Sequence, residues 1–328
     1  MKIKEIINYL QQIAPPVYQE SYDNAGLIVG NAQATITGVL ICLDSTEAIV
    51  DEAIEKGCNL IIAHHPIVFG GLKRFTGADY VQRTVIKAIK NDIAIYAIHT
   101  NLDNMYAKGV NEKFAEKLGL LNTRILSPKK VKKLLEVWLP KENEILAKEL
   151  AAAGFSPRFA QNRMSVPFDL AQKGALINML SAHQIEQERY QVLASENVSW
   201  QIGAGMIGEL PKAMPEMEFL KSLKQKMKTA CVRYTPLLGK PIKKVAICGG
   251  SGSFLLRQAI QRGADIFITG DFKYHEFFDA ENRIIIADIG HFESEQFTID
   301  LLFEHLSKKF SNFALHCTNL TTNPVQYL

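Results

Sequence analysis

The sequence has 328 residues and is 47% hydrophobic, which is enough for one large or two ordinary globular domains with cores of their own. Its formal charge of +3 and isoelectric point near 8.4 fall short of the basic balance of a dedicated nucleic-acid-binding domain. No apolar run reaches the roughly 18 residues of a membrane-spanning helix.

The first predicted element is an amphipathic helix at the N-terminus. Ile3, Ile6, Leu10 and Ile13 recur at helical spacing, unlike the continuous apolar centre of a signal peptide. The five cysteines are odd in number and contain no CxxC pair, so buried, reduced thiols are expected. We therefore expect a soluble cytoplasmic protein without a membrane partner.

An internal repeat organises the rest of the chain. Residues 36–65 and 242–271 align without gaps at a constant offset of 206, and each reads as strand, turn, helix, strand. Their apolar runs are continuous and rich in β-branched residues, as in strands covered on both faces. A further strand is predicted in each half, at 92–103 and at 282–292. The sequence thus predicts two related α/β halves that form one domain.

The segment between the halves has a different pattern of predicted strands and helices. A strand (KKLLEVWLP), a helix from Lys141 (KENEILAKELAAAGF), a second strand, a second helix and a last strand follow one another there. This alternation resembles a ferredoxin-like α+β insert. Since it carries a single histidine, His183, it is not expected to house the chemistry. The predicted organisation is residues 1–126 for the first half, 127–198 for the insert and 199–328 for the second half.

Histidines and carboxylates gather just after the predicted strands. Ligands of parallel α/β sheets bind beyond the carboxyl ends of the strands. Six of the eight histidines follow four such strands, and scattered core histidines would not collect in this way. The groups are, in chain order, His64, His65, His99, Asp103, Asp271, His275, His291 and Glu295.

Five of these groups predict a metal site: His64, His65, Asp103, His291 and Glu295. His291 and Glu295 are four residues apart, which places them on one face of a helix. Imidazole nitrogens with carboxylate oxygens suit zinc first, with manganese or iron as alternatives. Five ligands exceed one tetrahedral site and suit two divalent ions per chain, bridged by a carboxylate. For the two adjacent histidines alone, a structural role in capping a turn is the alternative.

The other histidines have less certain roles. His99 and His275 are candidate catalytic residues, which either orient the metal ligands or are metal ligands themselves, and one of them would move protons. His305 and His316 lie on a predicted amphipathic helix and a terminal strand, and we interpret them as surface or packing residues.

Two glycine-containing stretches lie near the predicted site. CGGSGS (248–253) follows a strand and precedes a helix, where backbone amides could hold a phosphate, but a plain tight turn needs the same glycines. It matches neither a P-loop nor a dinucleotide-binding motif. DNAGLIVG (23–30) is interpreted as a turn near the mouth of the site, with or without a functional role.

Several motifs in this order resemble those of one known family. YDNAGLIVG, IIAHHPIVFGGLKR, YAIHTNLDN, VAICGGSGS, TGDFKYHEFFDA and GHFESEQF are similar to motifs of the Nif3-like dinuclear metal centre hexameric proteins, related to the yeast NGG-interacting factor. Many members are labelled GTP cyclohydrolase 1 type 2 homologues. The resemblance covers about three quarters of the chain, and the middle segment looks like the insert of the longer bacterial members.

The resemblance implies a two-metal site on the same five residues, with Asp103 as the bridge. It also implies a toroidal homohexamer in which the inserts cap the openings. The chain departs from the family at Tyr22, where tryptophan is common, and in its shorter insert, which puts the capping role in doubt more than the metal site.

The leading functional hypothesis is a metal-dependent hydrolase acting on a small-molecule nucleotide or phosphate ester, including GTP cyclohydrolase I activity by resemblance. The alternative is a non-catalytic metal-handling protein or an oligomeric scaffold. A nucleic-acid role would need the lysines concentrated in a patch such as KKVKK (129–133), which we interpret instead as a solvated domain junction.

Overall fold

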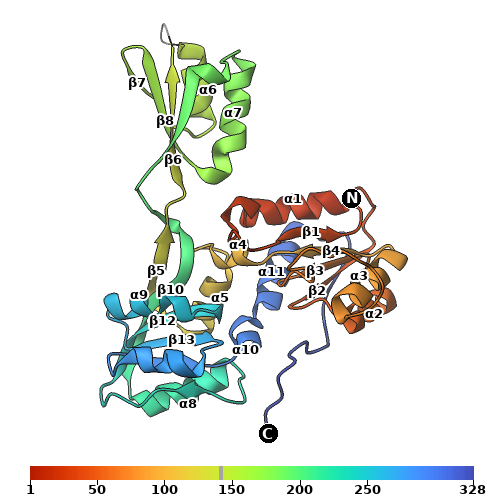
Figure 1. Ribbon diagram of the computed structural model, residues 1–328, viewed down its shortest axis with the longest axis vertical. Coiled ribbons are helices and arrows are strands. Elements are labelled where there is room, and N and C mark those ends of the chain that lie inside the picture. Colours follow the sequence, from red (N-terminus) through yellow and green to blue (C-terminus); the bar gives the residue numbers. More distant parts are fainter. Residues whose placement is uncertain (140–142) are drawn as a thin grey trace. The chain divides into compact units, whose positions relative to one another are not determined.

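The structure is a computed structural model that describes residues 1–139 and 143–328 (Figure 1). The chain forms two compact units. The larger unit contains Met1–Ser127 and Gly203–Leu328, and the smaller unit contains Pro128–Ile202. Across the described part of the chain, we find no helix with the length and apolar character needed to cross a bilayer.

The larger unit contains two sheets, and the first has five strands in the order β1-β4-β3-β2-β15. The inner strands run parallel to one another, and β1 is antiparallel to β4. The strands are β1 (Gly26–Val29), β2 (Gly38–Cys42), β3 (Leu60–Ala63), β4 (Ala94–Ala97) and β15 (Ala314–Cys317).

Helices cover both faces of the first sheet. Val39 and Ile41 of β2 pack with α1 (Ile3–Ile13) and α11 (Thr298–Lys309) on one face. Leu40, next along the strand, packs on the other face, as alternation along a strand requires. The helices on that second face are α2 (Glu47–Glu55) and α3 (Tyr80–Lys90). Burial on both faces explains why these strands read as continuous apolar runs.

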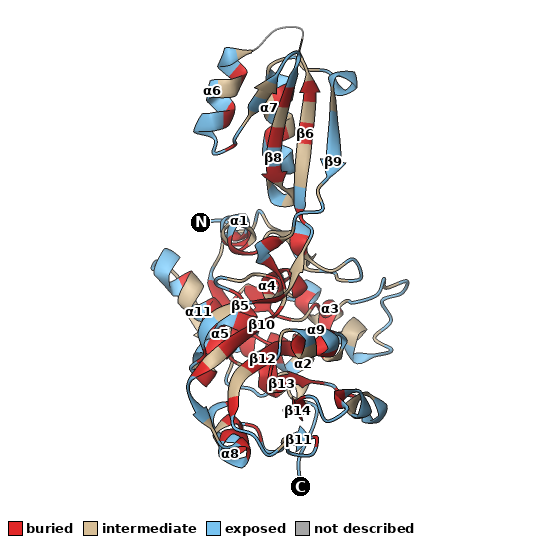
Figure 2. Ribbon diagram, turned by 90° about the vertical axis from the view of Figure 1, so that its left-hand side faces the viewer, coloured by how far each residue is buried: buried red, intermediate tan, exposed pale blue. Residues whose placement is uncertain are grey.

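The second sheet has six strands in the order β11-β14-β13-β12-β10-β5. Its centre, β12, β13 and β14, is parallel, whereas β10 is antiparallel to β12 and β11 is antiparallel to β14. Figure 2 shows buried residues concentrated in its middle strands. The strands are β5 (Leu121–Lys129), β10 (Ser199–Met214), β11 (Arg233–Tyr234), β12 (Ile242–Ser251), β13 (Ile266–Gly270) and β14 (Ile285–Asp288).

The second sheet is also covered on both faces. Side chains of α5 (Val110–Leu118) and α8 (Glu216–Lys226) pack on one face around Ile247 and Ile268. On the other face α9 (Leu256–Gln261) packs near Phe267. Two short helices, α4 (Thr100–Asp103) and α10 (His291–Glu295), follow strands β4 and β14 and begin where the polar groups of the predicted site are found.

The smaller unit has the element order β6-α6-β7-β8-α7-β9 and an antiparallel sheet in the order β7-β8-β6-β9. Leucines of its two helices pack against one face of this sheet. The elements are β6 (Lys132–Trp138), α6 (Glu144–Ala152), β7 (Arg158–Ala160), β8 (Arg163–Asp169), α7 (Lys173–Ala182) and β9 (Tyr190–Ala194).

The structure differs from the sequence expectations in three local details. The strand predicted at 92–103 is shorter, because the polar residues after His99 form α4 instead. Residues 248–251 continue strand β12 rather than forming a turn. The helix predicted from Lys141 is observed from Glu144, and residues 141 and 142 lie outside the described part of the chain.

Candidate metal centre

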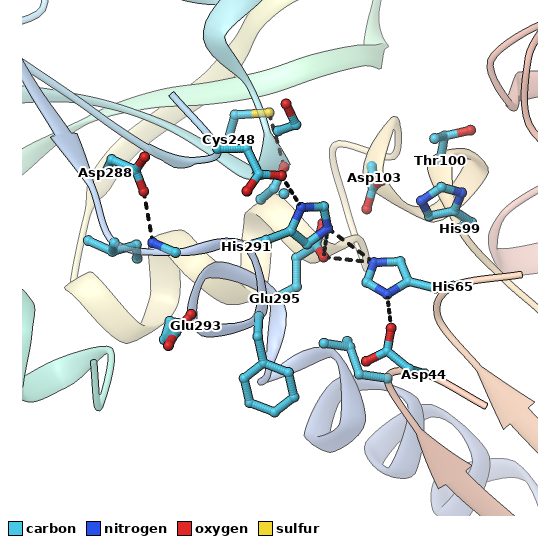
Figure 3. A pocket seen from close by; sticks show the side chains of 18 of the residues that line it. Asp44, His65, His99, Thr100, Asp103, Cys248, Asp288, His291, Glu293 and Glu295 are labelled. Carbon is cyan, nitrogen blue, oxygen red and sulfur yellow. Dashed lines mark hydrogen bonds and ion pairs between the residues drawn. The ribbon is translucent and has the colours of Figure 1, made fainter. Parts of the chain in front are cut away.

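The carboxyl ends of strands from both sheets of the larger unit meet at one cavity of about 730 Å³. His64 and His65 directly follow β3, and Asp103 ends α4, which follows β4. From the second sheet, α10 presents His291 and Glu295 on one helical face. Figure 3 shows His65, His291 and Glu295 turned toward one another, with Asp103 nearby.

Six donor atoms of five residues form a chain of close approaches. Glu295 Oε2 is 3.0 Å from His65 Nε2 and 3.1 Å from His291 Nε2. His65 Nε2 and His291 Nε2 are 3.3 Å apart. His64 Nε2 is 3.5 Å from Asp103 Oδ1 and 3.6 Å from Glu295 Oε1. The folding of both sheets thus brings together all five residues that the sequence singled out as ligands.

The other ring nitrogen of each of these histidines is held by an acceptor. His64 Nδ1 donates to the Ile98 carbonyl at 2.8 Å. Carboxylates hold the other two: Asp44 lies 2.7 Å from His65 Nδ1 and Asp271 lies 2.6 Å from His291 Nδ1. With a cation bound at the centre, this arrangement would keep the proton on Nδ1 and leave the Nε2 lone pair for the ion, as second partners of metal-bound histidines do.

Two of the donor atoms in this cluster have no hydrogen-bond partner in the part of the chain that the structure describes. His64 is fully buried, and within the described residues neither its Nε2 nor Asp103 Oδ1 has a hydrogen-bond partner. Buried polar atoms without partners cost about 1 to 3 kcal/mol each. His64, His65 and Glu295 offer ligand atoms that all lie within 4.8 Å of one another. This cluster of nitrogen and oxygen donors fits a divalent cation such as zinc, manganese or iron.

The pKa shifts of the cluster also favour a bound cation. Burial raises the pKa of Asp103, and the neighbouring Glu295 carboxylate raises it further. Burial alone would lower the pKa of His65 and His291, but their carboxylate partners raise the two values to about 10 and about 11. The bare cluster therefore takes up protons to balance its carboxylates, and a cation at the centre would provide that positive charge instead.

In the glycine-rich stretch 248–253, Gly250 allows the Glu295 carboxylate to lie close to the backbone. A Cβ on Gly250 would lie 2.4 Å from Glu295 Oε1, and the φ of Gly250 is +65°. The Gly250 amide donates to Ser294 Oγ at 2.9 Å, and the Gly249 amide donates to Asn111 Oδ1 at 3.0 Å. These two amides are already engaged, which weakens the phosphate-binding interpretation of this stretch.

The two histidines predicted to be catalytic are placed differently. His99 lines the cavity, its ring centroid is 5.3 Å from that of His65, and Asp23 Oδ1 lies 2.7 Å from its Nδ1. His275 is exposed, contacts the ring of Tyr274 and is not among the residues that line the cavity. The geometry supports a role at this site for His99 and provides no such support for His275.

Sequence reasoning missed several groups that hold the site. Asp44 follows β2, a strand end that carries no histidine and therefore drew no attention. Asp23, which lies in the turn of uncertain role at 23–30, also bonds Thr100. The C-terminal segment reaches the cavity as well: Thr322 Oγ1 donates to Asp44 at 2.6 Å, and Asn323 donates to Glu293 at 3.0 Å. No periodicity marks that segment, so only the strand-end position of Asp44 was a usable signal.

Comparisons with known proteins extend over the whole chain. A family model described as Duf34/NIF3 (NGG1p interacting factor 3) matches residues 1–324. A Staphylococcus epidermidis protein named GTP cyclohydrolase 1 type 2 homolog is 32% identical over an alignment of 367 residues that covers 100% of both chains. A solved Bacillus cereus protein related to NIF3 is 32% identical, with a TM-score of 0.80 and coverage of 100% of this chain and 99% of that one. A solved Staphylococcus aureus protein is 31% identical, with a TM-score of 0.82 and the same coverage of both chains.

Proposed function

The chain belongs to the Duf34/NIF3 family, and from that premise we propose that it is a dinuclear metal-dependent hydrolase acting on a nucleotide or a phosphate ester. Its relatives are named GTP cyclohydrolase 1 type 2 homologues, which makes ring opening of a guanine nucleotide one candidate reaction. The proposed ligands of the two ions are His64, His65, Asp103, His291 and Glu295.

One observation carries the proposal: fully buried donor atoms without partners lie beside an open cavity. His64 Nε2 and Asp103 Oδ1 have no hydrogen-bond partner among the described residues, and Asp103 and Glu295 line the cavity wall. A centre with only a structural role is normally closed by its ligands, whereas a catalytic one adjoins space for a substrate. Five donor residues are more than one tetrahedral ion needs, which supports two ions rather than one.

The chain's own groups have distinct tasks in this proposal. Divalent ions bound there would polarise a substrate oxygen and make water acidic enough to lose a proton near neutral pH. His99, oriented through Nδ1 by Asp23, faces the same cavity and is the proposed carrier of protons. Asp44 and Asp271 orient His65 and His291. The sequence assigns a catalytic role to His275 too, and that assignment rests on the sequence alone.

The finer architecture is part of the proposal. We take the two sheets of the larger unit as related halves and the smaller unit as a ferredoxin-like insert, with the boundaries 1–126, 127–198 and 199–328. The element order of the smaller unit and its all-antiparallel sheet support the ferredoxin-like description. By family resemblance the protein is a cytoplasmic homohexamer.

The test is metal analysis and turnover on the full chain. The protein is purified without oxygen, its metal content per chain is measured, and hydrolysis of GTP, other nucleotides and phosphate esters is assayed, with Asp103→Ala as the control. About two ions per chain and turnover that Asp103→Ala abolishes are expected. Two ions without turnover of any compound would favour the alternative, a metal-handling protein or scaffold. Failure to bind divalent ions would refute both the hydrolase and the metal-handling protein and would leave the scaffold.

A further inference from the structure

The walls of the cavity beside the metal centre are strongly acidic. Among the described residues that line it, one is a guanidinium, Arg233, and none is a lysine. Arg233 is already engaged, because it pairs with Asp288 and donates to the Phe272 carbonyl at 3.0 Å. Against this single cation stand seven carboxylates that line the cavity: Glu20, Asp44, Asp103, Asp271, Asp288, Glu293 and Glu295.

Two bound divalent ions would not reverse this balance. With neutral histidines, seven carboxylates set against Arg233 and two doubly charged ions leave an excess of two negative charges on the lining. Sites for polyphosphates normally offer arginine, lysine or free backbone amides to the phosphate oxygens. Here the Gly249 and Gly250 amides are engaged by Asn111 and Ser294. A nucleoside triphosphate would therefore bring further negative charge to a wall that repels it.

Aromatic rings lead from the solvent side of this cavity to the histidine cluster. Tyr22 and Phe69 both line the cavity, are 64% and 53% exposed, and have ring centroids 6.3 Å apart. Phe69 in turn contacts the His99 ring, with centroids 6.0 Å apart, and His99 contacts His65 at 5.3 Å. A flat molecule packed on the exposed rings of Tyr22 and Phe69 would have its far edge directed at the metal centre.

We propose that the cavity takes a planar heterocyclic compound without a polyphosphate group, of the size of a nucleobase or nucleoside, packed against Tyr22 and Phe69. The volume of about 730 Å³ lies within the range of small-molecule sites, roughly 300 to 1,000 Å³. This inference rests on the proposed function for the presence of the two ions, and it goes beyond that function in the substrate, because a nucleobase or nucleoside carries no phosphate group.

The first experiment compares guanosine with GTP as ligands of the full chain loaded with its metal ions, by titration calorimetry. Guanosine is expected to bind at least about ten-fold more tightly than GTP at low ionic strength. The difference should shrink as salt is added, because screening weakens the repulsion felt by GTP and leaves an uncharged ligand unaffected. Tighter binding of GTP than of guanosine at low salt would overturn the inference.

Variants test the aromatic packing and the charge repulsion separately. Tyr22→Leu and Phe69→Leu should each weaken guanosine binding roughly ten-fold, the usual scale for loss of one base–aromatic contact. Tyr274→Leu is the matched control, since Tyr274 is 71% exposed and does not line the cavity. Glu20→Gln keeps the acceptor that Asn104 uses, 3.1 Å away, and removes one negative charge. It should tighten GTP binding more than guanosine binding.

Metal content, measured on every sample, separates failure of this inference from failure of the proposed function. If two ions are retained and neither guanosine nor adenosine nor cytidine binds, the inference fails while the metal-centre proposal stands. If guanosine binds to a chain that takes up no metal, the proposed function fails while the planar-ligand inference stands.

Discussion

Thr322 Oγ1 lies 2.6 Å from Asp44 Oδ2, and the other oxygen of Asp44 lies 2.7 Å from His65 Nδ1. The C-terminal segment therefore acts on a proposed metal ligand through one shared carboxylate. A carboxylate held in this way fixes the orientation of the imidazole and increases its basicity as a ligand.

Removing the Thr322 hydroxyl should weaken metal binding. We expect Thr322→Val to lower the affinity for zinc several-fold, less than the roughly 10- to 100-fold typical for loss of a direct partner such as Asp44. Thr322→Ser keeps the hydroxyl and should retain the wild-type affinity, and so should Thr321→Ser, which keeps the acceptor of the Asn323 amide on an exposed neighbour. Competition with a chelator measures the affinity. Equal affinities for Thr322→Val and the wild type would show that the Thr322 hydroxyl does not support the centre.

Gly250 should be indispensable for metal binding. A methyl group there would lie 2.4 Å from Glu295 Oε1, and the backbone φ of +65° disfavours any side chain. Gly250→Ala should therefore displace the Glu295 carboxylate and strongly reduce the metal content. Gly174→Ala is the control, since no atom lies within 4 Å of its added Cβ and its position in α7 should gain about 0.5 to 1 kcal/mol of stability. Undiminished metal content in Gly250→Ala would contradict the assignment of Glu295 as a ligand.

The sequence was sufficient to predict the strand ends but not the contacts between distant segments. His64, His65 and Asp103 follow strands that show as continuous apolar runs, so their convergence followed from parallel topology alone. The position equivalent to Asp44 in the sequence repeat, 206 residues later, is Gly250. One copy of the repeat supplies a carboxylate there and the other a glycine that admits Glu295, so similarity between the copies could not indicate either role.

The sequence also could not predict the contacts of chain segments that lack a periodic pattern. Thr322 lies in an irregular segment that donates hydrogen bonds to the carboxylates of Glu52, Asp44 and Glu293. Such contacts leave no pattern in the sequence. His275 shows the opposite case: it follows a strand end by a few residues, but the short helix that begins at Tyr274 leaves it exposed outside the cavity.

The metal-free protein should lose stability as the pH rises above neutrality. In the folded state the pKa values of His65 and His291 are about 10 and about 11, above the ordinary 6.5, because their carboxylate partners favour the charged rings. The folded chain thus holds protons that the unfolded chain releases, so this contribution is complete below about pH 6.5 and is lost as the pH rises through the folded values. The raised pKa of Asp103 acts in the same direction.

Bound metal should abolish this dependence, because ions displace the same protons and metal affinity increases with pH. Urea unfolding of the chelated and the zinc-loaded chain, at about pH 6.5 and about pH 8.5, measures the effect. The free energy of unfolding should fall with pH only for the chelated protein, and zinc at about 100 times its Kd should add about 2.7 kcal/mol. A parallel fall in both forms would place the titrating groups outside the metal centre.

His99 should be required for turnover but not for metal binding. Its Nδ1 is held by Asp23 and its ring lines the cavity, whereas His64, His65 and Glu295 offer ligand atoms that all lie within 4.8 Å of one another. We expect His99→Gln to lower kcat by roughly 10²- to 10⁴-fold, the range for loss of a general acid or base, with two ions per chain retained. The assay is turnover of the best substrate found, with metal content measured on the same samples.

His275→Gln is the matched comparison, because the strand-end pattern marks both histidines while only His99 lines the cavity. If the cavity of one chain contains the whole reaction centre, His275→Gln should keep its full kcat. A loss equal to that of His99→Gln would mean that His275 reaches a reaction centre that one chain does not complete. Loss of metal in His99→Gln would instead make His99 a ligand, and the proton would need another carrier.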